Sequence, residues 1–262
     1  MANSKIYLGS INIGSLFKGA SDVSIYLGAE KVYPLGEPAL KWLATYSDSH
    51  TESAQCGSSS EIVRNEINKT NLVSVEIGDC VTSIGELAFD GCSSLTSITI
   101  PNSVTTIGRG GLSFTGLIDV VLPNSVTSIS NEVFMSCSAL TSVTIPSGVT
   151  SIGEYAFQTC SNLTSVTIPS GVTSIGEYAF QTCSNLTSVT IPDSVTSIGS
   201  SAFRYCSRLA SVTVNATTPP ALGTNAFNNT NCPIYVPSAS VDAYKAASRW
   251  SSYASRIQAI PT

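Results

Sequence analysis

The residues whose spacing comes nearest to that of an enzyme site are two glutamates, Glu154 and Glu177. They occupy equivalent positions in two identical 23-residue segments, 140–162 and 163–185. If each segment forms one coil of a stack, the two backbones lie about 4.8 Å apart, close to the roughly 5–10 Å between the carboxyl groups of glycoside hydrolases. Duplication alone explains this spacing, and no neighbouring group can be named that would separate the two pKa values. We therefore predict that these glutamates face solvent at a turn and carry out no chemistry.

The other options for catalysis have less support. The single histidine, His50, lies in the polar sequence SDSH, so a Ser-His-Asp or Cys-His site would have to be built on an exposed loop. A carbohydrate-active site on Asp119 or Glu132 lacks a second carboxylate of tuned pKa. The GRGG sequence at 108–111 lacks the spacing of a phosphate loop, and no C-x-x-C pair suggests a zinc site. The sequence predicts a protein that is not an enzyme and has no cofactor or metal site.

The eight cysteines follow a repeat more closely than a disulfide framework. Thr115 fills one repeat position in a short coil, and in five other coils that position is a cysteine: Cys92, Cys137, Cys160, Cys183 and Cys206. Side chains at identical positions of stacked coils rarely present the torsion that a disulfide needs. A free cysteine packs like a small apolar residue, so we predict buried free thiols in preference to disulfides.

The duplicated segment is one unit of a longer repeat. Its leading leucine recurs every 23 residues, with one interval of 22, at Leu72, Leu95, Leu117, Leu140, Leu163, Leu186 and Leu209. This periodicity predicts a solenoid of about seven coils in which each coil contacts only its neighbours. Within LTSVTIP, the alternation of apolar and hydroxyl residues predicts one strand of a parallel sheet, which ends at the proline.

The next segments of each unit, VTSIG and EYAF, are predicted to fill the interior of the coil. One phenylalanine per coil should stack on its neighbours in an aromatic spine formed by Phe89, Phe114, Phe134, Phe157, Phe180, Phe203 and Phe227. A single coil cannot bury its own phenylalanine, so each coil depends on the next.

Ten positions of one unit carry a family resemblance: Leu163, Val166, Ile168, Pro169, Val172, Ile175, Gly176, Ala179, Phe180 and Cys183. They follow the pattern L-x-x-I-x-I-P-x-x-V-x-x-I-G-x-x-A-F-x-x-C. Over residues 70–232 the chain resembles the BspA-like, or treponemal-type, leucine-rich repeats. The resemblance implies a right-handed β-solenoid with a parallel sheet. Departures at Ser130, at residues 108–114 and before Leu117 predict a local irregularity within that fold.

Charge is unevenly distributed along the repeats. No basic residue lies between Arg109 and Arg204, and the five acidic residues there account for the whole net charge of −5. Nucleic-acid binding requires Lys and Arg along the contact surface, so we predict none. No apolar run is long enough to span a membrane as a helix, and the N-terminal IYLGSINIGSLF lacks the cleavage site of a signal peptide.

The segments before the repeats are assigned to two units. Residues 1–37 contain the related phrases IYLGSINIGSLF and IYLGAEKVYPL, which predict a small β module that anchors the chain to another surface. These phrases resemble N-terminal modules of structural proteins from phages of gut Bacteroidetes. Residues 38–69 contain the hairpin-like KWLATYSDSHTESAQ and predict an N-terminal cap.

Residues 233–262 are predicted to cap the other end of the repeats. The phrase PIYVP predicts a last strand. A helix should then begin at Ser240, with Asp242 in its first turn and Arg249 near its end. Trp250 is predicted to cover the last coil, because the ends of a solenoid must be closed.

The outward side of the strands is the predicted binding surface. Alternate strand residues leave the core, so their hydroxyl groups should form two parallel rows, interrupted by Asp119 and Val121. The candidate residues are Ser97, Thr99, Asp119, Ser142, Thr144, Ser165, Thr167, Ser188, Thr190, Ser211 and Thr213. Regularly spaced hydroxyl groups suit a glycan or an extended polypeptide. The alternative is a solubilising face without a ligand.

Together these features predict a non-enzymatic binding or adhesion protein, with a glycan or protein ligand on the repeats. Residues 1–37 would attach it to a larger assembly, and the chain could also associate with itself. We favour a phage virion as that assembly, with the chain as a structural or fibre protein. The alternative, implied by the family resemblance, is a bacterial cell-surface or secreted adhesin that binds host proteins. The predicted location is therefore a virion surface, or the cell surface or extracellular space.

Overall fold

The computed structural model describes residues 7–8, 11–12, 25–27, 30–32, 39–57 and 59–261. Two short antiparallel pairs lie near the N-terminus: β1 (Tyr7–Leu8) with β2 (Ile11–Asn12), and β3 (Ile25–Leu27) with β4 (Glu30–Val32). Strands are therefore present in both IYLG phrases. The rest of segment 1–37 lies outside the described residues, and its anchoring role stays a prediction.

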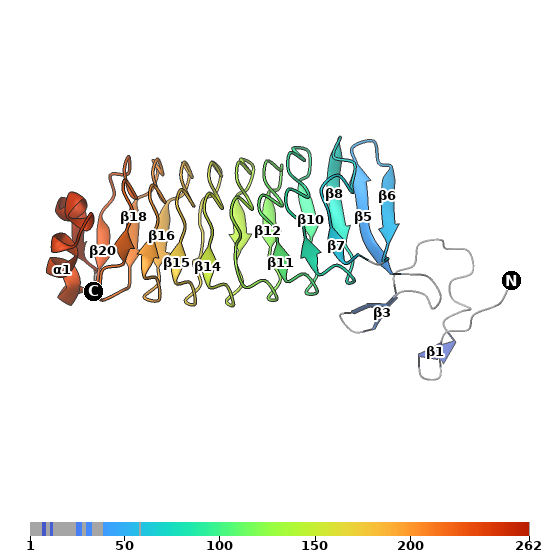
Figure 1. Ribbon diagram of the computed structural model, residues 1–262, viewed down its shortest axis with the longest axis horizontal. Helices are drawn as coiled ribbons and strands as arrows, with labels where there is room; N and C mark the ends of the chain where they lie inside the picture. Colours follow the sequence, from blue (N-terminus) through green and yellow to red (C-terminus); the bar gives the residue numbers. More distant parts are fainter. Residues whose placement is uncertain are drawn as a thin grey trace.

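Beyond these pairs the described chain winds into a β-solenoid stacked along one axis (Figure 1). It has about nine turns where the repeats predict about seven, because segments 38–69 and 233–262 also contribute strands to its walls. One wall is formed by β8 (Leu72–Ile77), β10 (Ser97–Thr99), β12 (Asp119–Val121), β13 (Ser142–Thr144), β16 (Ser188–Ile191), β18 (Ser211–Val214), β20 (Ile234–Val236) and β21 (Ile257–Ala259). These strands run parallel, and equivalent residues of adjacent coils pair, as Ser188 does with Ser211. We call the outward side of this wall the strand face.

A second wall is built from shorter parallel strands. They are β7 (Glu61–Ile62), β9 (Ser83–Ile84), β11 (Thr106–Ile107), β14 (Ser151–Ile152), β15 (Ser174–Ile175), β17 (Ser197–Ile198) and β19 (Ala221–Leu222). Ile129 continues this wall through a single bridge to Ile152. In each two-residue strand the isoleucine or leucine is buried, so both walls contribute to one core.

The third wall contains no strands among the described residues, yet backbone hydrogen bonds still connect its coils. Tyr155, Phe157 and Thr159 donate their amides to carbonyl groups of the next coil. Tyr155 and Thr159 have φ values of 57° and 60°, and the same left-handed conformation recurs in the other coils. In these turns alternate amide groups point along the solenoid axis and donate to carbonyl groups of the next coil. They therefore have hydrogen-bond partners even though no strand is present.

The predicted aromatic spine is present, with one correction. Phe134, Phe157, Phe180, Phe203 and Phe227 stack with centroid separations of 5.1–5.5 Å. Phe89 is also buried, but Phe114 is 47% exposed, and the fully buried Leu112 occupies its expected position. Leu112 lies 23 residues after Phe89, whereas Phe114 corresponds to Gly91, and both Phe114 and Gly91 have left-handed backbones. The chain therefore keeps its period and places the aromatic ring outside.

The cysteines at the shared repeat position are buried and free, as predicted. Each thiol from Cys137 to Cys206 donates to a backbone carbonyl of the preceding coil, as Cys183 does to Phe157 at 3.2 Å. Thr115 takes the same place in the short coil and donates to the Leu112 carbonyl at 2.9 Å. A small side chain with a weak donor therefore fits this position.

The N-terminal end of the solenoid is covered by a hairpin, as the KWLATYSDSHTESAQ phrase predicts. β5 (Leu40–Tyr46) pairs antiparallel with both β6 (Thr51–Gln55) and β8. Cys56 and Cys80 form a disulfide that joins the end of β6 to the turn after β8. The prediction of free thiols is wrong for this pair. Both cysteines lie outside the shared repeat position, at strand ends that the antiparallel arrangement brings to a Cα separation of 6.1 Å.

The C-terminal cap differs in detail from its prediction. β20 forms as predicted, followed by η2 (Ser238–Ser240) and by α1, which ends early (Val241–Ala246). Arg249 has a φ of 65° and separates α1 from the 3-10 helix η3 (Trp250–Arg256), so the single helix expected to end near Arg249 is wrong. The chain then returns as β21, which pairs with β20 and adds a strand beyond the predicted last one.

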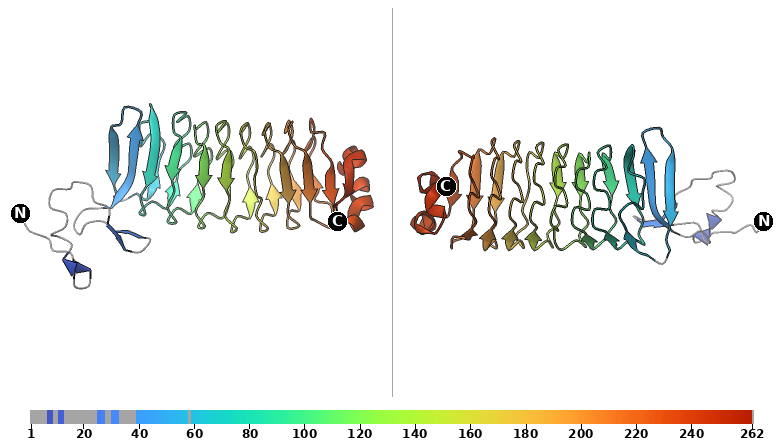
Figure 2. Two further views of the ribbon diagram at one scale, coloured as in Figure 1. Left: turned by 180° about the vertical axis from the view of Figure 1, so that it is seen from behind. Right: turned by 45° about the horizontal axis from the view of Figure 1, so that its top comes forward.

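Trp250 closes the core at this end, as expected. It is fully buried, and its ring centroid lies 5.9 Å from that of Phe227. Its indole N–H donates to the Pro220 carbonyl at 2.8 Å. Figure 2 shows the helices covering one end of the coil stack and the β5–β6 hairpin at the other. Both ends of the core are therefore shielded from solvent.

We predict that Phe157→Ala destabilises the chain by about 3–5 kcal/mol, because it opens a cavity between two stacked rings. Urea unfolding followed by circular dichroism measures the change. Phe114→Ala is the matched control, since this ring is half-exposed, and it should cost less than about 1 kcal/mol. Equal losses for the two variants would contradict the assignment of the spine.

The buried thiols predict loss of stability at alkaline pH. Burial raises the pKa of Cys92 to about 11 and raises the pKa of Cys183 well above its usual value. The thiols thus stay protonated in the folded chain while those of the unfolded chain ionise from about pH 8.5. Their stabilising contribution is complete below that pH and is lost as pH rises through the folded-state pKa values.

The urea midpoint should accordingly hold steady from pH 7 to 8.5 and fall toward pH 11. The fall should be smaller in Cys183→Ala. Alkylation counted by mass spectrometry provides the check, since the six free thiols should react at pH 8.5 only after unfolding. Rapid alkylation of all six in the folded chain would contradict this account.

Candidate binding face

The two predicted rows of side chains lie along the strand face, one pair per coil. On β13, Ser142 and Thr144 are exposed on either side of the buried Val143. The same alternation holds for the other candidate residues, although Ser211 and Thr213 are only partly exposed. In-register pairing therefore sets equivalent side chains about 4.8 Å apart along the axis.

The structure divides these rows into blocks. Ser97 and Thr99 belong to the sheet of β8 and β10, whereas Asp119 pairs with Ser142 in a separate two-stranded sheet. Ser165 reaches its neighbour through a single bridge to Ser188. The face is thus a series of short sheets in line, interrupted after β10 and after β13.

Sequence reasoning missed residues that lengthen the rows at both ends. Ser74 and Glu76 pair with Ser97 and Thr99. Tyr235 pairs with Thr213, and Gln258 pairs with Tyr235. The alternation within PIYVP could have identified Tyr235. No sequence signal marks Gln258, because helices separate β21 from the repeats.

The hydroxyl groups differ in whether the protein itself satisfies them. Just before the rows, Thr164 and Thr187 donate their hydroxyl groups to backbone carbonyls of the preceding coil at 3.2–3.4 Å. On the second wall, Thr150 and Thr173 do the same. Within the described residues, the hydroxyl groups of the candidate rows make no such bond, except that Ser142 donates to Asp119. The candidate rows are therefore left to bind solvent or a ligand.

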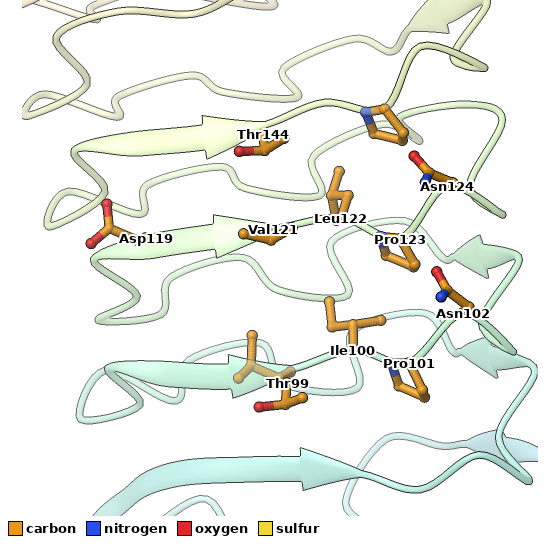
Figure 3. A pocket seen from close by; sticks show the side chains of 12 residues that line it. Thr99, Ile100, Pro101, Asn102, Asp119, Val121, Leu122, Pro123, Asn124 and Thr144 are labelled. Atoms are coloured by element: carbon orange, nitrogen blue, oxygen red, sulfur yellow. The ribbon is translucent and has the colours of Figure 1, made fainter. Parts of the chain in front are cut away.

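The break in the sheet between β10 and β12 changes both the shape and the chemistry of the face. β10 and β12 do not pair as a ladder, and Ile98 and Ile100 are only partly buried beside this break. Val121, which stands where other coils have threonine, is 69% exposed. A hollow of about 550 Å³ lies here, bounded by Thr99, Asp119, Val121, Asn102 and Asn124 among others (Figure 3). This hollow is larger than the one of about 410 Å³ that lies further along the strand face, lined by Ser165, Thr167 and Thr190 among others.

Asp119 is held in position by the next coil. Its Oδ1 accepts hydrogen bonds from Ser142 Oγ at 2.5 Å and Thr141 Oγ1 at 3.1 Å. No Lys or Arg in the described structure pairs with it. The carboxylate therefore presents an uncompensated negative charge beside the neutral hydroxyl groups of the next coil.

The structure does not assemble the catalytic alternatives. Glu132 pairs with Arg109 at 2.8 Å on the third wall, so it lies on a different wall from Asp119. Glu154 and Glu177 are exposed at turns, as predicted. No group of three metal-ligating side chains occurs among the described residues.

His50 lies in the turn between β5 and β6, where its ring stacks on Tyr46 and its Nδ1 contacts Asp48. It is exposed, as its polar surroundings predict. The contacts of His50 thus stabilise the hairpin turn.

Comparison with known proteins identifies the repeat. A family model for the BspA type leucine rich repeat region matches residues 60–187 and 127–242. A search of curated proteins finds no match. No helix within the described residues is both long and apolar enough to cross a bilayer.

Solved structures of similar proteins come from several bacteria. A leucine-rich repeat protein from Bacteroides ovatus has a TM-score of 0.47 and 19% identity, covering 84% of this chain and 71% of that one. A leucine rich cell surface protein from Faecalibacterium prausnitzii has 0.41 and 25%, covering 83% and 77%. The T. pallidum leucine rich repeat protein has 0.39 and 21%, covering 84% and 96%.

Proposed function

The chain belongs to the BspA-type leucine-rich repeat family, and from this we propose that it is an extracellular binding or adhesion protein whose strand face holds an extended ligand. The observation that carries the proposal is the pair of exposed hydroxyl groups that recurs in successive coils and, except at Ser142, has no protein partner in the described structure. The neighbouring threonines, by contrast, are satisfied by backbone carbonyls. A ligand with a similar repeat can form the same contact at each coil.

The strength of these hydrogen bonds determines how tightly one copy of the strand face can bind a ligand. A hydrogen bond of this kind contributes about 1 kcal/mol net. If the ligand makes one such hydrogen bond per coil, four coils give about 4 kcal/mol, which corresponds to a Kd in the millimolar range. Such weak binding suits adhesion, in which many copies act together and avidity raises the overall affinity. Tighter or selective binding requires a further anchor on the same face.

The Cys56–Cys80 disulfide supports a location outside the cytosol, because disulfides persist in oxidising compartments. It favours a cell-surface or secreted adhesin over a protein assembled in the cytosol, such as a virion component. Attachment through residues 1–37 is a second proposal, suggested by the paired short strands β1–β2 and β3–β4. In this second proposal segment 1–37 joins the chain to other molecules, whereas the adhesin proposal requires only the strand face.

We expect the hydroxyl rows to be required for binding. A variant carrying Ser165→Ala, Thr167→Val, Ser188→Ala and Thr190→Val should lose about 30-fold or more in affinity, since it removes about 2 kcal/mol or more of hydrogen bonding. Binding of multivalently displayed chains to arrays of glycans and peptides measures the change. The control is Thr150→Val with Thr173→Val, which alters two second-wall hydroxyl groups. Equal binding by both variants would rule out the rows as the binding surface.

Attachment through segment 1–37 predicts an effect on mass in solution. The full chain should form a defined oligomer, and a chain beginning at Pro38 should be monomeric with an unchanged circular dichroism spectrum. Multi-angle light scattering distinguishes the two. Monomers in both cases would refute the assembly role and leave the cell-surface adhesin.

A further inference from the structure

We infer that the break in the sheet between β10 and β12 is a selectivity site for an extended polypeptide that carries a basic side chain and an apolar side chain two residues apart. The site consists of Asp119, Val121 and the hollow between β10 and β12. This inference rests on the proposed function for the choice of the strand face. It adds the class of ligand and the anchor that the hydroxyl rows lack.

The apolar half of the site is a consequence of the broken sheet. Ile98 and Ile100 remain partly accessible beside the gap, and Val121 projects from β12 with 69% of its surface exposed. Figure 3 shows Val121, Ile100 and Leu122 at the hollow between the two coils. Among the described residues no aromatic side chain lines this hollow, so they offer a sugar ring nothing to stack on there. An aliphatic side chain, by contrast, can cover Val121 and the isoleucines.

The polar half of the site selects for positive charge. The carboxylate of Asp119 is oriented by Ser142 and Thr141 through one oxygen only. Its other oxygen has no partner in the described structure. Since residues 110–203 contain five acidic and no basic residues, a cationic group approaches this coil without repulsion. A lysine or arginine of the ligand supplies the missing partner.

The spacing of the two halves favours a polypeptide over a glycan. Asp119 and Val121 are alternate residues of β12, both pointing outward, so they lie about 6.6 Å apart. Alternate residues of an extended peptide have the same separation and also point to one side. The amide side chains of Asn102 and Asn124 at the rim can bond to the peptide backbone (Figure 3).

The test uses an array of immobilised heptapeptides and the full chain displayed multivalently. The reference peptide is Gly-Ser-Lys-Thr-Val-Ser-Gly. The comparison peptides replace Lys by Thr, replace Val by Thr, or place Lys and Val side by side. We expect the reference peptide to bind at least about tenfold better than each of these. The advantage of Lys should shrink at 0.5 M salt, because salt screens an exposed ion pair.

Three single variants assign the two halves of the site. D119N should abolish the preference for Lys, and V121T, which restores the residue that other coils carry, should abolish the preference for Val. E154Q removes the same charge from the third wall and should change neither. Circular dichroism confirms that each variant is folded.

Each outcome bears on one proposal. Equal binding of all peptides, or a D119N variant that behaves like E154Q, would overturn this inference. If those results accompany glycan binding that depends on Ser165, Thr167, Ser188 and Thr190, the proposed function stands and only the peptide site fails. Peptide preference that is lost in D119N but unaffected by the hydroxyl-row variant would support the site, because the substituted hydroxyl groups lie two and three coils beyond β12.

Discussion

In-register hydrogen bonding between equivalent residues of adjacent coils is the constraint on which the rest of the structure depends. It operates on all three walls, through parallel strands on two of them and through left-handed turns on the third. Because each residue then lies above its counterpart in the adjacent coil, a residue type that recurs at one repeat position forms a row along the solenoid axis. The phenylalanine spine, the thiol row and the hydroxyl rows all follow from this arrangement. None of these rows can form within a single coil.

The same constraint explains which parts of the fold could be predicted from the sequence. Interior positions recur every 23 residues, so the spine, the buried cysteines and the outward rows are readable from the period. Residue type predicts Phe114 in the spine, whereas the chain keeps the 23-residue distance from Phe89 and buries Leu112 there. The Cys56–Cys80 bridge and β21 lie outside the repeats, where contacts depend on tertiary arrangement and no period indicates them.

The candidate site can be predicted from the sequence only in part. Alternation along each strand identifies which hydroxyl groups point outward, but it does not distinguish those with protein partners from those without. That distinction depends on whether a hydroxyl group reaches a backbone carbonyl of the preceding coil, as that of Thr164 does and that of Thr167 does not. Likewise, a missing residue before Leu117 signals an irregularity, yet the resulting break between β10 and β12 is a property of three-dimensional register. Departures from the repeat thus carry the information that distinguishes one coil from another.

The two coils 140–162 and 163–185 have the same sequence, and their rings Phe157 and Phe180 stack with centroids 5.1 Å apart. Either could therefore be removed, or a third inserted, without creating a new kind of interface. Such a change would alter only how far the Asp119 coil lies from the C-terminal cap, in steps of about 4.8 Å. The number of duplicated segments thus determines the length of the solenoid, and this length can change in evolution without altering the residues of the binding face around Asp119.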